Sequence, residues 1–202
     1  MTYDVAAAAI AASVLAAPPT LGSGRLVCVD GPSGSGKSTL AAALNRAFRD
    51  RLRASGSASA SAHVRVIRMD NVYDGWAGLD AGMATVATSV VAPLALGQPG
   101  RYRRFDWHAM SFAEERVVAP CDVLVVEGVG SWSPAIQDAV TCLVWTDTPS
   151  DVRLERGVAR DGEQMRERLL AWRAQEDAML ARLATRSHAD VVVDGQTSVV
   201  TS

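Results

Sequence analysis

A single lysine, Lys37, occurs among the 202 residues, and it lies in the glycine-rich segment Gly31–Thr39. This segment matches Gly-x-x-x-x-Gly-Lys-Ser/Thr, a pattern whose backbone N–H groups surround the phosphates of a nucleotide. The lysine of the pattern reaches the β- and γ-phosphates, and the hydroxyl that follows it, here Ser38, holds Mg²⁺. A compact ammonium suits this position better than a planar guanidinium. The nucleotide-binding residues predicted here are Gly31, Ser33, Gly34, Ser35, Gly36, Lys37, Ser38 and Thr39.

The residues around this segment supply the structural context that the motif needs. Arg25–Asp30 is a short apolar run that predicts a buried strand leading into the glycines. After the glycines, Leu40, Leu44 and Phe48 recur every four residues among alanines, which predicts an amphipathic helix. A helix that begins there points its free N–H groups and the positive end of its dipole at the loop. The alternative, a glycine-rich turn that binds nothing, does not explain this context.

Three acidic residues follow predicted strands and could take part in the chemistry. Asp30, Asp70 and Glu127 each end an apolar or alternating run, so they are expected at one edge of a sheet. Glu127 is predicted to hold Mg²⁺ together with Ser38. Asp70 is predicted to accept the proton of an acceptor hydroxyl. The alternative for Glu127 and Asp70 is a helix cap or a loop carboxylate.

Three arginines form a row in the helix expected from Pro149 onward. Arg153, Arg156 and Arg160 are three and four residues apart and therefore share one helical face. Such a row could close over phosphates as a lid at about residues 150–170, because guanidinium groups grip oxyanions in pairs of hydrogen bonds. Alternatively, the row is an exposed face that pairs with neighbouring acids.

The elements that must position these residues indicate an α/β fold. Five strand-like runs alternate with helical segments, which predicts a doubly wound, mostly parallel five-stranded sheet with ligands beyond the carboxyl ends of its strands. We expect one domain, residues 1–202, with an alanine-rich helix within residues 1–20 and a low-complexity connection at 54–62. The runs are residues 25–30, 63–69, 122–128, 141–146 and 189–194.

Composition excludes several classes of protein. The chain is 49% hydrophobic and 21% charged with a net charge of −2, which fits an ordinary globular domain and argues against a nucleic-acid partner. The three cysteines lack the spacing of a zinc site or a disulfide framework, so a cytoplasmic location is expected. The apolar run Val5–Ala17 is not expected to be a secretory signal, because an acid rather than a basic segment precedes it. The run is also too short to span a membrane. The oligomeric state stays open, and a homo-oligomer is compatible with the sequence.

At this point the chain resembles the uridine kinase and phosphoribulokinase-like group of P-loop kinases, from Arg25 to Gly195. Beside the loop, Asp70-Asn71-Val72-Tyr73 resembles the Asp-x-x-Tyr segment of the group, and Val125–Gly128 resembles its strand ending in Glu-Gly. Arg156 through Arg160-Asp161 resembles its Arg-x-x-x-Arg-Asp lid. The resemblance implies a P-loop NTPase fold, ATP with Mg²⁺, and a catalytic base at Asp70. Catalytic roles are implied for Lys37, Asp70, Arg156 and Arg160, and acceptor contacts for Asp70, Tyr73, Tyr102, Arg104 and Asp106.

The sequence departs from the group at the acceptor side. Gly157 stands where uridine kinases have a second arginine, and the lid after Asp161 is shortened. The Phe-Asp-His-Pro sequence of the group is missing. Residues 99–107 only loosely resemble the acceptor-contacting hairpin, so Arg103, Arg104 and Asp106 could instead read a phosphorylated or polyhydroxylated acceptor.

The function predicted from the sequence is an ATP-dependent kinase for a hydroxyl of a small metabolite, with a nucleoside first. A kinase for a sugar, a vitamin or a nucleoside monophosphate is the alternative within the enzyme class. An alternative of another class is a nucleotide-binding switch that hydrolyses ATP slowly and signals by ordering a loop.

Overall fold

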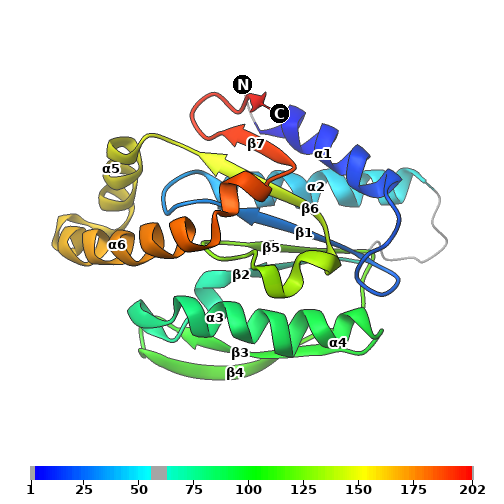
Figure 1. The fold of residues 1–202 in the computed structure, drawn as a ribbon, viewed down its shortest axis with the longest axis horizontal. Coiled ribbons are helices and arrows are strands. Elements are labelled where there is room, and N and C mark those ends of the chain that lie inside the picture. The colour runs from blue at the N-terminus through cyan, green and yellow to red at the C-terminus, as the bar shows by residue number, and fades with distance from the viewer. Residues whose placement is uncertain (1–2, 56–62, 202) are drawn as a thin grey trace.

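The computed structural model describes residues 3–55 and 63–201, and its centre is a six-stranded sheet (Figure 1). The strand order is β2-β5-β1-β6-β7-β8, and all neighbours are parallel except the last pair. The first five strands are the five predicted from the sequence, whereas the short antiparallel β8 was not foreseen. The strands are β1 (Arg25–Asp30), β2 (Val64–Arg68), β5 (Val123–Glu127), β6 (Val140–Asp147), β7 (Val191–Asp194) and β8 (Val200–Thr201).

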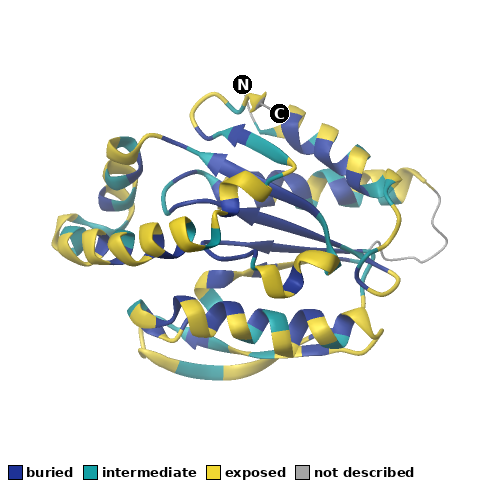
Figure 2. Ribbon diagram, viewed as in Figure 1, coloured by how far each residue is buried: buried dark blue, intermediate teal, exposed yellow. Residues whose placement is uncertain are grey.

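Burial explains why the central strands read as nearly continuous apolar runs. Every residue of β5 is buried, and β1 is buried from Leu26 onward, because helices cover both faces of the sheet (Figure 2). Alternate side chains enter separate cores. Leu26 and Cys28 pack toward one face, and Val27 and Val29 toward the other.

The helices form two layers and an end cap (Figure 1). Helices α1 (Asp4–Ala16) and α2 (Lys37–Ala54) cover one face, and small alanines let them approach closely. The other face carries α3 (Leu79–Thr85), a π-helical stretch at Val86–Val91, and α4 (Ala92–Ala95). Helices α5 (Ser150–Asp161) and α6 (Arg166–Leu183) lie beyond the carboxyl ends of the strands. Of the connection expected at 54–62, residues 56–62 lie outside the described residues.

A separate two-stranded hairpin covers the outer side of α3 and α4. Strand β3 (Gly100–Asp106) pairs antiparallel with β4 (Ser111–Val118), with an irregularity between Arg103 and Phe105. Phe105 is buried, and the turn brings Trp107 toward the carboxyl end of β2. Across residues 3–55 and 63–201, no helix has the length and apolar character needed to cross a membrane.

Candidate active site

The glycine-rich loop between β1 and α2 has the backbone shape that an anion cradle requires. Gly34 has φ +79° and Gly36 has φ +103°, a region that residues with a Cβ rarely adopt. A Cβ on Gly34 would lie 2.5 Å from the carbonyl oxygen of Arg153, so the loop also lies tightly against α5. Because α2 begins at Lys37, the N–H groups of its first turn have no partner within the helix and can face a phosphate.

Lys37 lies at the bottom of this loop. Its side chain is 7% exposed, and Nζ donates to the carbonyl oxygens of Gly31 at 2.7 Å and Pro32 at 2.9 Å. Burial lowers the pKa of Lys37, and the charge of Glu176, followed by Asp30, opposes that shift. The ammonium is therefore held beside the loop, within a cluster of acids that favours its charged form.

Ser38 and Glu127 meet as the sequence predicted for a magnesium site. The Ser38 hydroxyl donates to the two carboxylate oxygens of Glu127 at 3.1 and 3.2 Å. Burial raises the pKa of Glu127, and the charge of Lys37 opposes the shift. Pairing of β5 with β1 and β2 places Glu127 beside Val29 and Arg68, and the Arg68 guanidinium lies 3.6 Å from the carboxylate.

Asp30, by contrast, is a structural anchor. Its carboxylate is fully buried and accepts N–H bonds from Gly31 at 2.7 Å, Gly130 at 3.0 Å and Trp132 at 3.0 Å. Burial raises the pKa of Asp30 to about 6, although these three donors oppose the shift. Asp30 thus connects the start of the glycine-rich loop to the loop that follows β5, beneath the cavity.

Asp70 and Tyr73 lie just after the end of β2, and both line the cavity. The Asp70 side chain is exposed in the cavity wall, and its backbone carbonyl accepts the Nε1–H of Trp107 at 2.7 Å. Tyr73 is fully buried, and its hydroxyl donates to the Val129 carbonyl at 2.6 Å. Asp70 is therefore available to a ligand, whereas the Tyr73 hydroxyl already has a structural partner.

The three arginines predicted to form a row all line the same cavity, with different partners. Arg153 is buried and lies 3.4 Å from Glu176. Arg156 donates to the carbonyl of Gly34 at 3.2 Å and is exposed. Arg160 pairs with the adjacent Asp161, which leaves its guanidinium at the cavity rim.

A cavity of about 1210 Å³ connects these groups. The glycine-rich loop lines one part of the cavity, and Trp76, Trp107 and Trp172 form an aromatic wall in another part. This wall begins beside the loop, because the Trp172 Nε1–H donates to the Ser33 hydroxyl. Ring centroids in this wall are 5.2 Å apart for Trp76 and Trp107 and 5.8 Å for Trp76 and Trp172, both edge to face. The cavity is therefore large enough for a nucleotide and a second small molecule.

The remaining acceptor residues predicted from the sequence are not brought into this cavity wall. Arg104 pairs with Asp106 at 3.1 Å and with Glu114 at 2.9 Å on the hairpin. Asp106 also caps the hairpin turn through the N–H of His108. Tyr102 packs against the core beneath the hairpin. The hairpin residues that do line the cavity are Trp107, His108 and Met110.

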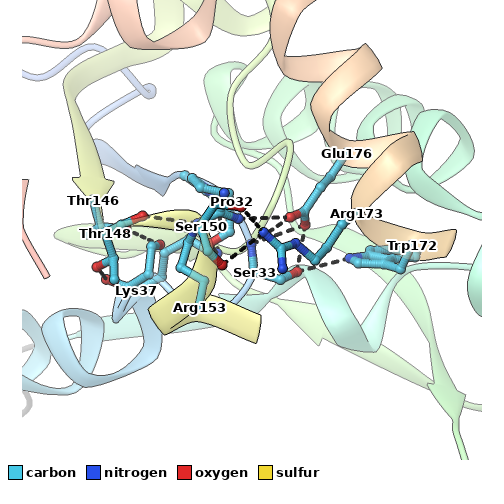
Figure 3. A network of polar contacts seen from close by, with 12 residues as sticks. Pro32, Ser33, Lys37, Thr146, Thr148, Ser150, Arg153, Trp172, Arg173 and Glu176 are labelled. Carbon is cyan, nitrogen blue, oxygen red and sulfur yellow. Dashed lines mark hydrogen bonds and ion pairs between the residues drawn. The ribbon is translucent and has the colours of Figure 1, made fainter. Parts of the chain in front are cut away.

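Two residues of α6 that the sequence did not single out lie against the loop (Figure 3). The Glu176 carboxylate accepts the Ser33 N–H at 3.0 Å, and the Trp172 Nε1–H donates to the Ser33 hydroxyl at 3.0 Å. They are four residues apart on one helical face. That spacing is the only signal in the sequence, and it is too common in helices to identify a site.

Gly157, which stands where uridine kinases have an arginine, has a packing role. A Cβ at this position would lie 3.3 Å from Leu169 Cδ1, so the small residue lets α5 pack closely on α6. Only Gly162 and a single 3₁₀ turn, Glu163–Met165, connect these two helices. The shortened lid is thus a compact helical corner at the cavity rim.

Comparison with solved structures identifies the fold. A protein described as a possible uridine kinase from Bacillus stearothermophilus is 19% identical, with a TM-score of 0.62, over 92% of this chain and 96% of that one. A proposed fructose transport system kinase from Silicibacter sp. TM1040 is 23% identical, with a TM-score of 0.55, over 91% and 94%. No family model and no curated protein matches the sequence. The chain therefore has the α/β fold of P-loop kinases, as the sequence predicted.

The residues at the glycine-rich end fit ATP and Mg²⁺. The left-handed glycines give the loop a backbone shape that residues with a Cβ rarely adopt, and the first turn of α2 supplies N–H donors to a phosphate. The hydroxyl of Ser38 and the carboxylate of Glu127 are oxygen donors of the kind that Mg²⁺ takes, and they are already in contact.

Proposed function

We propose that this protein is an ATP-dependent kinase that transfers the γ-phosphoryl group of ATP to a hydroxyl of a small metabolite, with a nucleoside as the first candidate. The observation that carries the proposal is one cavity lined by a phosphate cradle, by an aromatic wall and by Asp70, whose backbone carbonyl accepts the Trp107 Nε1–H. Phosphoryl transfer needs mainly positioning, positive charge and a group that orients the attacking hydroxyl.

The chain's own residues divide the work at the phosphate end. The N–H groups of the first turn of α2 and of the loop, other than that of Ser33, which is bonded to α6, bind the phosphates. Lys37 neutralises charge on the β- and γ-phosphates. Ser38 and Glu127 would hold Mg²⁺, which supplies further positive charge at these phosphates when bound. Arg156 and Arg160 project from α5 at the rim, where guanidinium groups can stabilise the charge of the migrating group.

At the acceptor end, Asp70 orients the hydroxyl and takes its proton as the new O–P bond forms. The acceptor leans on Trp76 and Trp107, whose faces favour a flat or ring-shaped molecule. The Nε1–H of Trp107 is already donated to the backbone carbonyl of Asp70, so the acceptor meets mostly apolar ring surface there. A nucleoside base can stack on this wall. A sugar kinase is the second candidate, because sugar rings also pack on indole.

A substrate panel tests the proposal. Purified protein is mixed with Mg-ATP and with nucleosides, nucleoside monophosphates, sugars or pantothenate-like alcohols, while ADP release and product mass are followed. We expect one compound class to accelerate ADP release and to gain one phosphoryl group. Tight ATP binding with ADP release that no compound accelerates, together with nucleotide-dependent binding of a partner protein, would favour the nucleotide switch instead.

A further inference from the structure

The phosphate loop is attached to α6 through a buried carboxylate that phosphoryl transfer does not itself require. Glu176 has no exposed surface, and it accepts both the N–H of Ser33 at 3.0 Å and its hydroxyl at 2.6 Å. One helical turn earlier, Trp172 donates its Nε1–H to the same hydroxyl at 3.0 Å. Figure 3 shows both side chains reaching from α6 to the loop. One residue of the loop is therefore held by two side chains from a single helix.

The position of Glu176 excludes a direct role in binding phosphate. The side chain is fully buried and does not line the cavity, so it cannot touch a ligand there. A negatively charged carboxylate close to bound phosphates would also repel them. A carboxylate at this place therefore needs another role, and its contacts indicate one. By accepting the Ser33 N–H, Glu176 fixes the orientation of Ser33 in the loop.

The partners of Glu176 make the attachment firm. A buried carboxylate is tolerated only where hydrogen bonds and an opposite charge compensate it. Ser33 contributes two donors, and the Arg153 guanidinium of α5 lies 3.4 Å away. The Arg153 Nε–H in turn donates to the Thr148 carbonyl at 3.0 Å, at the end of β6. Loop, lid helix and α6 are thus joined at one buried point.

Trp172 connects this point with the acceptor end of the cavity. Its ring centroid lies 5.2 Å from that of Tyr73 and 5.8 Å from that of Trp76, while its N–H holds Ser33. A molecule that presses on the aromatic wall therefore meets a side chain that is hydrogen-bonded to the phosphate loop.

The geometry points to Glu176 as the positioning residue that holds the phosphate loop in its nucleotide-binding shape through Ser33. Trp172 is the contact through which binding of the acceptor affects the loop. This inference rests on the proposed function for the identity of the acceptor. Its nucleotide part depends only on binding of ADP or ATP to the loop.

The test measures binding of Mg-ADP to the full chain by calorimetry. Glu176→Gln keeps the size of the side chain but removes the charge, and we expect it to weaken Mg-ADP binding by about tenfold, the equivalent of one charge-assisted hydrogen bond. Ser33→Ala removes only the hydroxyl, and about a threefold loss is expected. Glu167→Gln is the matched control, because Glu167 is an exposed acid on the same helix and does not line the cavity. Circular dichroism establishes that each variant is folded.

A spectroscopic readout separates positioning from general stability. Mg-ADP should change the tryptophan fluorescence of the wild type, because the Trp172 indole is bonded to the loop, and Trp172→Phe should lose most of that change while staying folded. Once an acceptor is known, Glu176→Gln should raise the KM for ATP more than it lowers kcat. If Glu176→Gln does not fold, Ser33→Ala carries the test.

Three results have distinct meanings. Wild-type affinity for Mg-ADP in folded Glu176→Gln, or in Ser33→Ala where the first variant does not fold, would overturn the inference. A wild type that binds Mg-ADP, responds as described and phosphorylates no compound would overturn only the proposed kinase function. A wild type that binds no nucleotide would overturn both.

Discussion

The phosphate end of the cavity is built from backbone, whereas the acceptor end is built from ring faces. At the phosphate end, one continuous segment, Gly31–Thr39, supplies the cradle, the lysine and a magnesium hydroxyl. At the acceptor end, Trp76 and Trp107 form the ring surface, and Trp172 lies between them and the loop, so the wall draws on three elements far apart in the chain. Phosphates are the same in every nucleotide and can be met by a local motif, while an acceptor surface has to be assembled by the tertiary fold.

The largest expected effect is at the phosphate end. Lys37→Ala should lower phosphoryl transfer by about 10²–10³-fold or more, because it removes the charge nearest the β- and γ-phosphates. The measurement is ADP release with the identified acceptor. Arg53→Ala, which changes an exposed cation at the end of α2, is the control and should retain wild-type turnover. Comparable turnover in the two variants would contradict the assignment of Lys37 to the phosphates.

The matching change at the acceptor end is Trp76→Ala. Loss of a stacking face should raise the KM for the acceptor by about tenfold and leave Mg-ADP affinity within about twofold. Leu96→Ala controls for removal of a large apolar side chain, because Leu96 is 77% exposed and lies away from the cavity. An equal loss of nucleotide and acceptor binding in Trp76→Ala would contradict the division into two ends.

The buried acid beneath the loop gives a pH dependence. The pKa of Asp30 is about 6 in the folded protein against 3.8 for the free side chain, so the folded state takes up a proton first as the pH falls. Lowering the pH from about 7.5 to about 5 should therefore stabilise the protein by about 1 kcal/mol, or about 2–4 °C in Tm. Burial raises the pKa of Glu127 as well, which acts in the same direction.

Asp30→Asn is the variant that isolates this contribution in thermal melts across the same pH range. The amide turns a donor toward one of the backbone N–H groups, so we expect lower stability overall. The rise in Tm between pH 7.5 and pH 5 should become smaller, because one titrating group is gone. An unchanged rise would show that another group causes it.

The smallest effect is predicted on the hairpin. Arg104→Ala should change the KM for the acceptor by less than about twofold, because Arg104 pairs with Asp106 and Glu114 outside the cavity wall. Steady-state kinetics with the acceptor decides the point. A tenfold rise in KM would mean that the hairpin moves onto the acceptor and that the sequence-based assignment was the better one.

The difference between the two ends also explains how much the sequence could predict. The five parallel strands, the glycine-rich loop and the pairing of Ser38 with Glu127 as magnesium ligands were predicted from local patterns, since strand ends and glycine spacing are visible in a single segment. The order of the strands in the sheet was not predicted. Those same patterns placed Asp30 at the cavity edge. They could not distinguish a carboxylate that faces a ligand from one that accepts three backbone N–H bonds below it.

The acceptor side was less predictable because its residues depend on register and tertiary packing. In the hairpin, Trp107 lines the cavity and Tyr102 packs into the core, and a shift of one residue would exchange such faces. Glu176 and Trp172 lie in an 18-residue helix that is rich in charged residues, most of them exposed. Nothing in that helix marks these two as the residues that reach Ser33.

Asp70 is the residue assigned to the transfer step itself, so the most direct test is transfer by Asp70→Asn measured beside its binding of Mg-ADP and of the acceptor. We expect both ligands to bind within about twofold of wild type, while transfer falls by about 10²–10⁴-fold, because the carboxylate that takes the proton is gone. Transfer close to the wild-type rate with both ligands bound would contradict the assignment of Asp70 and the joining of the two ends at that residue.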